Sequence, residues 1–214
     1  MEILYEDNHI IVAVKPAGVL SQADSSGAPD MLTLLKDYIK VKYNKPGNVY
    51  LGLVHRLDRP VSGVMVFART SKAASRLSEQ IRNHTVEKYY RAVVHGVFDA
   101  PEGRLTGYIL KNSADNTVRV FDKETKGAKY ASLSYKVLDS KDNKSLVEVK
   151  LDTGRSHQIR AQFAHSGHPL AGDRKYGYED GYKDIALVCC RMVIDHPVKG
   201  ERMEFEVEME KGRF

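Results

Sequence analysis

The sequence is short of cysteine and of long apolar runs. Its two cysteines, Cys189 and Cys190, are neighbours in the chain. Adjacent residues of a strand point to opposite faces, so a disulfide between them would strain the backbone, and we expect two buried thiols in a reducing compartment. No apolar run approaches the roughly 18 residues of a membrane span. The first residues lack the basic-then-apolar pattern of a signal peptide. These absences predict a cytoplasmic protein without a membrane partner.

Motifs of several enzyme classes are absent as well. Neither glycine pattern of the phosphate-binding loops occurs, which argues against a nucleotide cofactor. Ser156 precedes His157, but residues 154–158 lack the second glycine of a nucleophile elbow. His157, His165 and His168 lie close together in the chain, yet there is no His-Glu-x-x-His pattern and no cysteine pair near them. The sequence therefore predicts neither a hydrolase triad nor a metal site.

The chain does have an ordinary globular composition and a basic charge. Of its 214 residues, 42% are hydrophobic and 29% are charged, which allows a substantial core and predicts no long disordered tract. The formal net charge is +5 and the pI is about 9.0, which favours a polyanionic partner. We find no repeat, low-complexity tract or linker, so the sequence predicts a single domain.

The spacing of apolar residues predicts an α+β fold. The expected helices cover residues 31–43, 71–81 and 156–166, with Asp30 capping the first and Thr70 or Ser71 the second. The expected strands are residues 3–5, 10–14, 49–54, a strand ending at Ala68, and residues 88–95, 104–110, 117–121, 130–138, 145–151, 185–195 and 203–209. Several of these strands alternate apolar and polar residues, as half-buried antiparallel strands do. We therefore predict a large, mostly antiparallel mixed sheet with a few flanking helices and loops.

A charged, turn-forming stretch at residues 55–60 precedes an apolar strand. Its carboxylate, Asp58, lies between Arg56 and Arg59. Pro60 has no backbone donor and restricts Arg59 to extended conformations. The pattern predicts a rigid loop that presents one acid at the mouth of the strand, between two cations that favour its ionised form. A surface turn with a solvated ion pair explains the composition at least as well.

A tyrosine occupies the strand-like segment 87–94. There Tyr90, Ala92 and Val94 share one face of the predicted strand. A tyrosine on an apolar face is usually a core residue, so this pattern alone does not indicate a site.

The segment 151–165 places an arginine on a predicted helix. Ile159 and Phe163 fall on one face and anchor the helix to the core, while Arg160 falls on the opposite face beside small alanines. The alanines allow close packing, so the guanidinium could be partly buried. A buried guanidinium needs an anion, and a carboxylate could hold it bidentately. The alternative is an ordinary exposed helix charge.

Four sequence blocks, taken in order, resemble the signature motifs of the RluA-type pseudouridine synthases. They are His-Arg-Leu-Asp at 55–58 followed by Ser62-Gly63, Lys88-x-Tyr90-x-Ala92, the block from Gly154 to Arg160, and the block from Gly167 to Gly177. The resemblance runs from Lys15 to Pro197 and leaves out residues 21–48 and 97–125. It implies the pseudouridine synthase fold. It also implies an enzyme that isomerises uridine to pseudouridine in structured ribosomal or transfer RNA, without metal or cofactor.

The resemblance implies roles for individual residues. Asp58 would be the catalytic residue, with Arg160 paired to it, and Tyr90 would stack on the target base. Leu187 occupies the place of a family leucine that packs in the uridine pocket. After that leucine the family often has His-Ala, where this chain has Val188 and Cys189.

RNA binding is implied for His55, Arg56, Arg155 and His157, with Arg56 filling the space that a flipped-out base leaves. Many family members carry a small RNA-binding domain before the first hairpin. We expect residues 1–214 to form one catalytic domain without it, and to act as a monomer. Further phosphate contacts are expected from basic residues outside the apolar faces: Arg69, Lys72, Arg76, Arg82, Arg174 and Lys175.

Two questions stay open at the level of sequence. Asp58 could promote cleavage of the glycosidic bond by attacking the sugar or by removing a sugar proton. An RNA-binding protein or RNA chaperone of the same fold without catalysis would share the basic charge and the aromatic residues. The presence of Asp58, Tyr90 and Arg160 together favours the enzyme, since binding alone needs no lone carboxylate facing a polyanion.

Overall fold

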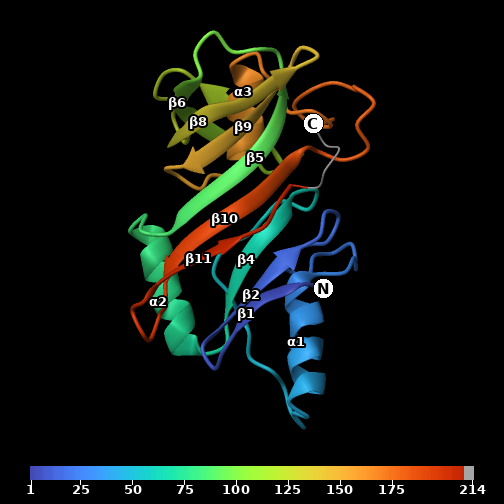
Figure 1. Cartoon of the computed structure of the whole chain (residues 1–214), viewed down its shortest axis with the longest axis vertical. Coiled ribbons are helices and arrows are strands. Elements are labelled where there is room, and N and C mark those ends of the chain that lie inside the picture. The colour runs from blue at the N-terminus through green and yellow to red at the C-terminus, as the bar shows by residue number, and fades with distance from the viewer. Residues whose placement is uncertain (210–214) are drawn as a thin grey trace. The chain divides into compact units, whose positions relative to one another are not determined.

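The chain folds into two units, each built around its own antiparallel strands (Figure 1). The computed structural model describes residues 1–209. The first unit holds residues 1–87 and 189–207, and the second holds residues 88–188 and residues 208–209. Both units combine antiparallel strands with helices, so the predicted α+β class is confirmed. None of the helices within residues 1–209 is long and apolar enough to cross a membrane.

The strands of the first unit include two that are buried almost throughout. The strands are β1 (Ile3–Glu6), β2 (Ile10–Lys15), β3 (Gly52–Leu53), β4 (Ser62–Ala68), most of β10 (Leu187–Asp195) and β11 (Arg202–Glu206). They lie in the order β1-β2-β4-β10, with β11 beside β10 and β3 beside β4. Nearly every residue of β2 and β4 is buried, so these two strands form the centre of the unit's core.

Two helices of the first unit begin where the sequence predicts. In α1 (Met31–Lys42), the side chain of Asp30 accepts a hydrogen bond from Thr33 N at 3.1 Å. In α2 (Ser71–Arg82), the side chain of Thr70 accepts one from Ala73 N, also at 3.1 Å. Such N-caps satisfy backbone donors that the helix itself leaves without a partner. The predicted caps are confirmed.

The second unit is a five-stranded antiparallel arrangement with one helix. Its strands are β5 (Glu87–His95), β6 (Glu102–Asn112), β7 (Thr117–Phe121), β8 (Lys129–Lys141) and β9 (Lys144–Leu151), in the order β5-β9-β8-β6-β7. The helix α3 (Gln158–His165) packs on β6 and β7. A small apolar cluster of Ile109, Val118, Ala131 and Ala161 fills this contact.

Several predicted elements are shorter than the sequence indicated, among them the strand predicted at residues 185–195, which begins at Leu187. Of residues 49–54 only Gly52 and Leu53 form a strand, and the last strand ends at Glu206. The helix α3 begins at Gln158 because His157 has a left-handed backbone with φ 51° and ψ 22°. The side chain of Gln158 accepts hydrogen bonds from Arg155 N and from the Thr153 hydroxyl, so local side-chain bonds take the place of the predicted first helical turn.

Both cysteines are buried thiols, as the sequence predicts. Cys189 also explains a glycine of the acid-loop motif. Gly63 has φ 125°, and a Cβ at this position would collide with the backbone of Cys189. Only glycine therefore lets β4 approach β10 this closely.

Candidate active site

The predicted acid loop leads directly into β4 and is fixed to the rest of the first unit at Leu57. Leu57 is buried, and its carbonyl oxygen accepts a hydrogen bond from the hydroxyl of Ser21 at 2.8 Å. Its N–H donates to the same hydroxyl at 3.0 Å. Val61 N donates to Asp58 O at 3.0 Å and closes the turn around Pro60. The loop is therefore rigid, as Pro60 predicts, and Asp58 is only half-buried in it.

Lys15, at the end of β2, lies behind the acid loop. Its side chain is fully buried, and Nζ donates to three carbonyl oxygens: Pro16 O at 3.0 Å, Val19 O at 2.6 Å and Arg59 O at 3.0 Å. Arg59 O also accepts from Gly18 N at 2.9 Å. One ammonium group thus joins the loop after β2 to the residue that follows Asp58.

Burial lowers the pKa of Lys15 from 10.5 to about 8, while the negative charge of Asp58 acts in the opposite direction and Arg59 lowers it further. The apolar run of β2 ends at Lys15, and nothing in this pattern indicates that the lysine itself would be buried. The cations expected beside Asp58 were Arg56 and Arg59. Arg56 is exposed, and Nε of Arg59 donates to Gly18 O at 3.1 Å.

Replacing Lys15 with Met is expected to lower the free energy of unfolding at pH 7, because the part-buried carbonyls of Pro16 and Val19 lose this donor, while Arg59 O keeps its bond from Gly18 N. A carbonyl left without a partner costs up to about 1–3 kcal/mol, the upper end applying only to full burial. The pH dependence has a definite sign. The folded lysine releases its proton near pH 8 and the unfolded one near 10.5, so between these values unfolding takes up a proton. The free energy of unfolding of the wild type, taken relative to that of Lys15→Met, is therefore expected to be about 1 kcal/mol higher at pH 9 than at pH 7.

Urea denaturation at both pH values measures this difference. Lys72→Met, which removes an exposed lysine on α2, is the matched control. A stability difference between wild type and Lys15→Met that stays constant or shrinks from pH 7 to 9 would contradict the burial of a charged Lys15.

The two residues before Leu57 differ in their surroundings. Arg56 is exposed, which suits the RNA contact expected of it. The ring of His55 accepts a hydrogen bond from Val66 N at Nε2, at 3.0 Å. His55 therefore holds the loop against β4, a role that the sequence did not indicate.

Arg160 in the second unit is buried and held by a carboxylate. Its side chain is 7% exposed, and that of Asp173 is 1% exposed. Nε donates to Asp173 Oδ2 at 2.7 Å and Nη2 donates to Asp173 Oδ1 at 2.8 Å. The prediction of a buried guanidinium held bidentately by a carboxylate is confirmed, and Asp173 is a partner that the sequence analysis missed. The pairing of Arg160 with Asp58 stays a prediction, and Nη1 lies outside the bidentate pair.

The turn that carries Asp173 is organised by this same carboxylate. Asp173 Oδ1 also accepts from Lys175 N at 3.0 Å and from Tyr176 N at 3.3 Å. Before it, Gly172 has φ 73°, and a Cβ there would collide with the backbone of Asp184. The structure thus explains why glycine stands at position 172 and aspartate at position 173 of the block from Gly167 to Gly177.

Tyr176 contacts Arg160 from this turn. The guanidinium carbon of Arg160 lies 5.1 Å from the centroid of the Tyr176 ring. The Tyr176 hydroxyl lies 2.6 Å from His157 Nδ1 and accepts from Val118 N at 2.9 Å. His157 was expected to contact RNA; its ring is engaged with Tyr176 at the start of α3.

Three further predicted residues lie in the second unit. Tyr90 is 6% exposed and shares its face of β5 with Ala92, as predicted. Leu187, at the start of β10, is 3% exposed. Arg155 is exposed, and its Nε donates to Tyr130 O at 2.9 Å. Within residues 1–209, no group of three or more His, Cys, Asp or Glu side chains is placed to hold a metal ion.

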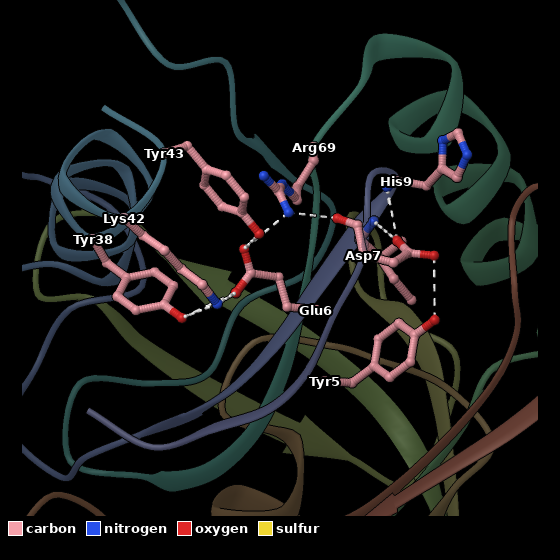
Figure 2. A network of polar contacts seen from close by, with 9 residues as sticks. Tyr5, Glu6, Asp7, His9, Tyr38, Lys42, Tyr43 and Arg69 are labelled. Atoms are coloured by element: carbon pink, nitrogen blue, oxygen red, sulfur yellow. Dashed lines mark hydrogen bonds and ion pairs between the residues drawn. The ribbon is translucent and has the colours of Figure 1, made fainter. Parts of the chain in front are cut away.

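Arg69 is not the exposed cation that the sequence suggested. Its side chain is 10% exposed, and Nη1 donates to Glu6 Oε1 at 2.9 Å and to the carbonyl oxygen of Asp7 (Figure 2). Burial by itself raises the pKa of Glu6, but hydrogen bonds from Lys42, Tyr43 and Tyr38 outweigh it and hold the pKa below its usual value. Arg69 therefore belongs to a structural network between the first hairpin and α1.

Comparison with known proteins matches this chain to proteins of one kind. The family model described as RNA pseudouridylate synthase matches residues 9–165. An uncharacterized RNA pseudouridine synthase of Aquifex aeolicus is 35% identical, over 97% of this chain and 69% of the relative. Ribosomal large subunit pseudouridine synthase D of Zymomonas mobilis is 30% identical, over 98% of this chain and 69% of the relative. This chain thus spans about two thirds of the length of each.

A solved structure has the same fold. The human protein RNA pseudouridylate synthase domain containing 4 superposes with a TM-score of 0.82, over 98% of this chain and 89% of that one, at 22% identity. The predicted fold is therefore confirmed.

Proposed function

We propose that this chain, which belongs to the RNA pseudouridylate synthase family and is an RNA pseudouridine synthase, uses Asp58 as its catalytic residue. The observation that carries this proposal is the construction of the acid loop. Ser21, Lys15 and the turn at Pro60 fix the backbone around a half-buried carboxylate. A surface turn would need no buried lysine behind it. A rigid support is what a catalytic acid needs in order to meet its substrate in one orientation.

The substrate is a uridine within structured RNA. Its base cannot be reached while it is stacked in a helix, so the nucleotide flips into the site, as it does for other base-modifying enzymes. Arg56 is exposed on the acid loop two residues before Asp58, and we assign to it the filling of the space that the base leaves. His55, Arg155 and His157 complete the RNA contacts implied by the family motifs.

The isomerisation breaks one bond to the sugar and makes another. Asp58 promotes cleavage of the N-glycosidic bond, by attacking the sugar or by removing a sugar proton. The detached uracil rotates in place, joins the sugar through C5 and loses the C5 proton. No oxidant, reductant or second substrate is needed, because product and substrate are isomers.

Three residues of the second unit support this chemistry in our proposal. Tyr90 stacks on the uracil, and Leu187 closes the pocket, so that the detached base neither escapes nor meets water. Arg160, which the family motifs pair with Asp58, is itself held by Asp173 through Nε and Nη2. A fixed cation holds the carboxylate in one direction.

The RNA that we propose is that of the large ribosomal subunit, modified in the cytoplasm. The support is the similarity to a relative named for that activity. Transfer RNA is the second candidate, since the family motifs are compatible with both.

Pseudouridine mapping of total RNA from cells with and without the gene is expected to show the loss of one or a few sites in large-subunit ribosomal RNA. Complementation with the wild-type gene should restore these sites, and complementation with the Asp58→Asn gene should not. Loss confined to transfer RNA would overturn the choice of RNA. An unchanged map, together with no activity of the purified protein on either RNA, would overturn the proposed function.

A further inference from the structure

The side chain of Tyr176 joins three separate parts of the second unit. Its ring faces the guanidinium of Arg160, with 5.1 Å between ring centroid and Cζ. Its hydroxyl is 2.6 Å from His157 Nδ1, just before α3, and accepts from Val118 N on β7 at 2.9 Å. The family motifs of the sequence analysis assign no role to this tyrosine.

The restraints on Arg160 are complementary. Asp173 holds Nε and Nη2 with two parallel hydrogen bonds, which fix the guanidinium at one edge. A ring placed against the guanidinium face opposes rotation out of that plane and adds a cation–π attraction. Because Tyr176 N also donates to Asp173 Oδ1 at 3.3 Å, one carboxylate places both the arginine and the ring that covers it.

The hydroxyl of Tyr176 acts on the backbone that carries Arg160. His157 immediately precedes α3 with a left-handed backbone and makes no side-chain cap to the helix. A non-glycine residue held in this conformation is strained and persists only where surrounding contacts fix it. The short contact to the Tyr176 hydroxyl is such a fixing contact. Tyr176 therefore restrains the first turn of α3 as well as the guanidinium.

We propose that Tyr176 is a positioning residue for the isomerisation: its ring and hydroxyl hold the guanidinium of Arg160 in the orientation that the reaction needs. The proposal rests on the proposed function, in which Arg160 serves Asp58. In this scheme Tyr176 acts through Arg160.

Packing is the competing explanation, since Tyr176 also contacts the apolar cluster of Ile109, Val118, Ala131 and Ala161. A packing residue affects stability but leaves the chemical step intact in molecules that remain folded. A positioning residue changes the rate of the chemical step with RNA already bound. Single-turnover measurements at saturating RNA, made well below the melting temperature of every variant, separate the two.

Three variants test the proposal. Tyr176→Leu removes both ring and hydroxyl, and we expect its single-turnover rate to fall about 10- to 100-fold, since small misplacements near a reacting centre can reach 10²-fold. Tyr176→Phe keeps the ring over Arg160, so the decrease in the logarithm of its single-turnover rate should be at most half of that for Tyr176→Leu. Tyr178→Leu, an exposed tyrosine of the same loop, should retain the wild-type rate. The dissociation constant for RNA should change by less than about threefold in all three, since none of them removes a phosphate contact.

A double-mutant cycle tests whether Tyr176 acts through Arg160. In an Arg160→Lys background, Tyr176→Leu should lower the remaining rate by less than about twofold, because lysine lacks the planar guanidinium that the tyrosine ring restrains. The proposal would be overturned if the rate loss of the double variant equalled the product of the losses of the two single variants. A wild-type single-turnover rate for folded Tyr176→Leu would overturn it as well. Failure of the proposed function would instead appear as an active Asp58→Asn with Tyr176 intact, so the two failures are distinguishable.

Discussion

Asp58→Asn is expected to abolish pseudouridine formation while RNA binding and folding persist. The amide has the shape of the carboxylate but lacks the charge needed to attack the sugar or to take its proton. Loss of such a group lowers turnover by at least about 10²–10⁴-fold. Because Asp58 is only half-buried, the exchange should change the free energy of unfolding by about 1 kcal/mol or less.

Three measurements belong together in this test: tritium release from C5-labelled RNA, RNA affinity by filter binding, and thermal unfolding. Asp37→Asn removes an exposed acid of α1 and is the matched control. Near wild-type turnover by Asp58→Asn on the true substrate would contradict the mechanism. RNA binding without turnover also decides against a purely RNA-binding protein, provided that the wild type is active under the same conditions.

Arg160→Ala is expected to reduce both stability and turnover. It leaves the carboxylate of Asp173, whose side chain is 1% exposed, without its guanidinium. Breaking a buried pair in this way typically costs about 3–5 kcal/mol, compared with 0–1 kcal/mol for an exposed pair. Urea denaturation measures the loss of stability. An unchanged melting temperature with intact activity would show that the pair contributes little.

A double variant separates the structural part of this effect from the functional part. Arg160→Met combined with Asp173→Asn removes both charges and keeps similar side-chain volumes, so it should recover most of the stability lost in Arg160→Ala. Turnover should stay low, because Asp58 still lacks its cation. Recovery of turnover together with stability would mean that Arg160 serves the fold alone.

Local patterns in the sequence were sufficient for much of this protein. Asp30 and Thr70 cap helices because a short polar side chain before an apolar periodic segment satisfies the first backbone donors. Pro60 limits the conformations of the acid loop, and Tyr90 is buried because its strand face is apolar. In each case the determining neighbours lie within a few residues. The family motifs added the identity of the reaction, which no local pattern contains.

Tertiary structure decided which side chains meet across long stretches of chain. Lys15 is buried because three carbonyls, two near it and one at Arg59, converge on its ammonium group, and no periodicity encodes such convergence. Arg160 meets Asp173 because the turn after α3 folds back over the helix.

The same holds for the left-handed His157, which shortens α3 because Tyr176 holds its ring from nineteen residues away. The sequence by itself therefore determined the elements and the catalytic candidate. The supports of the site depend on hydrogen bonds and packing between distant segments, which exist only once the chain has folded.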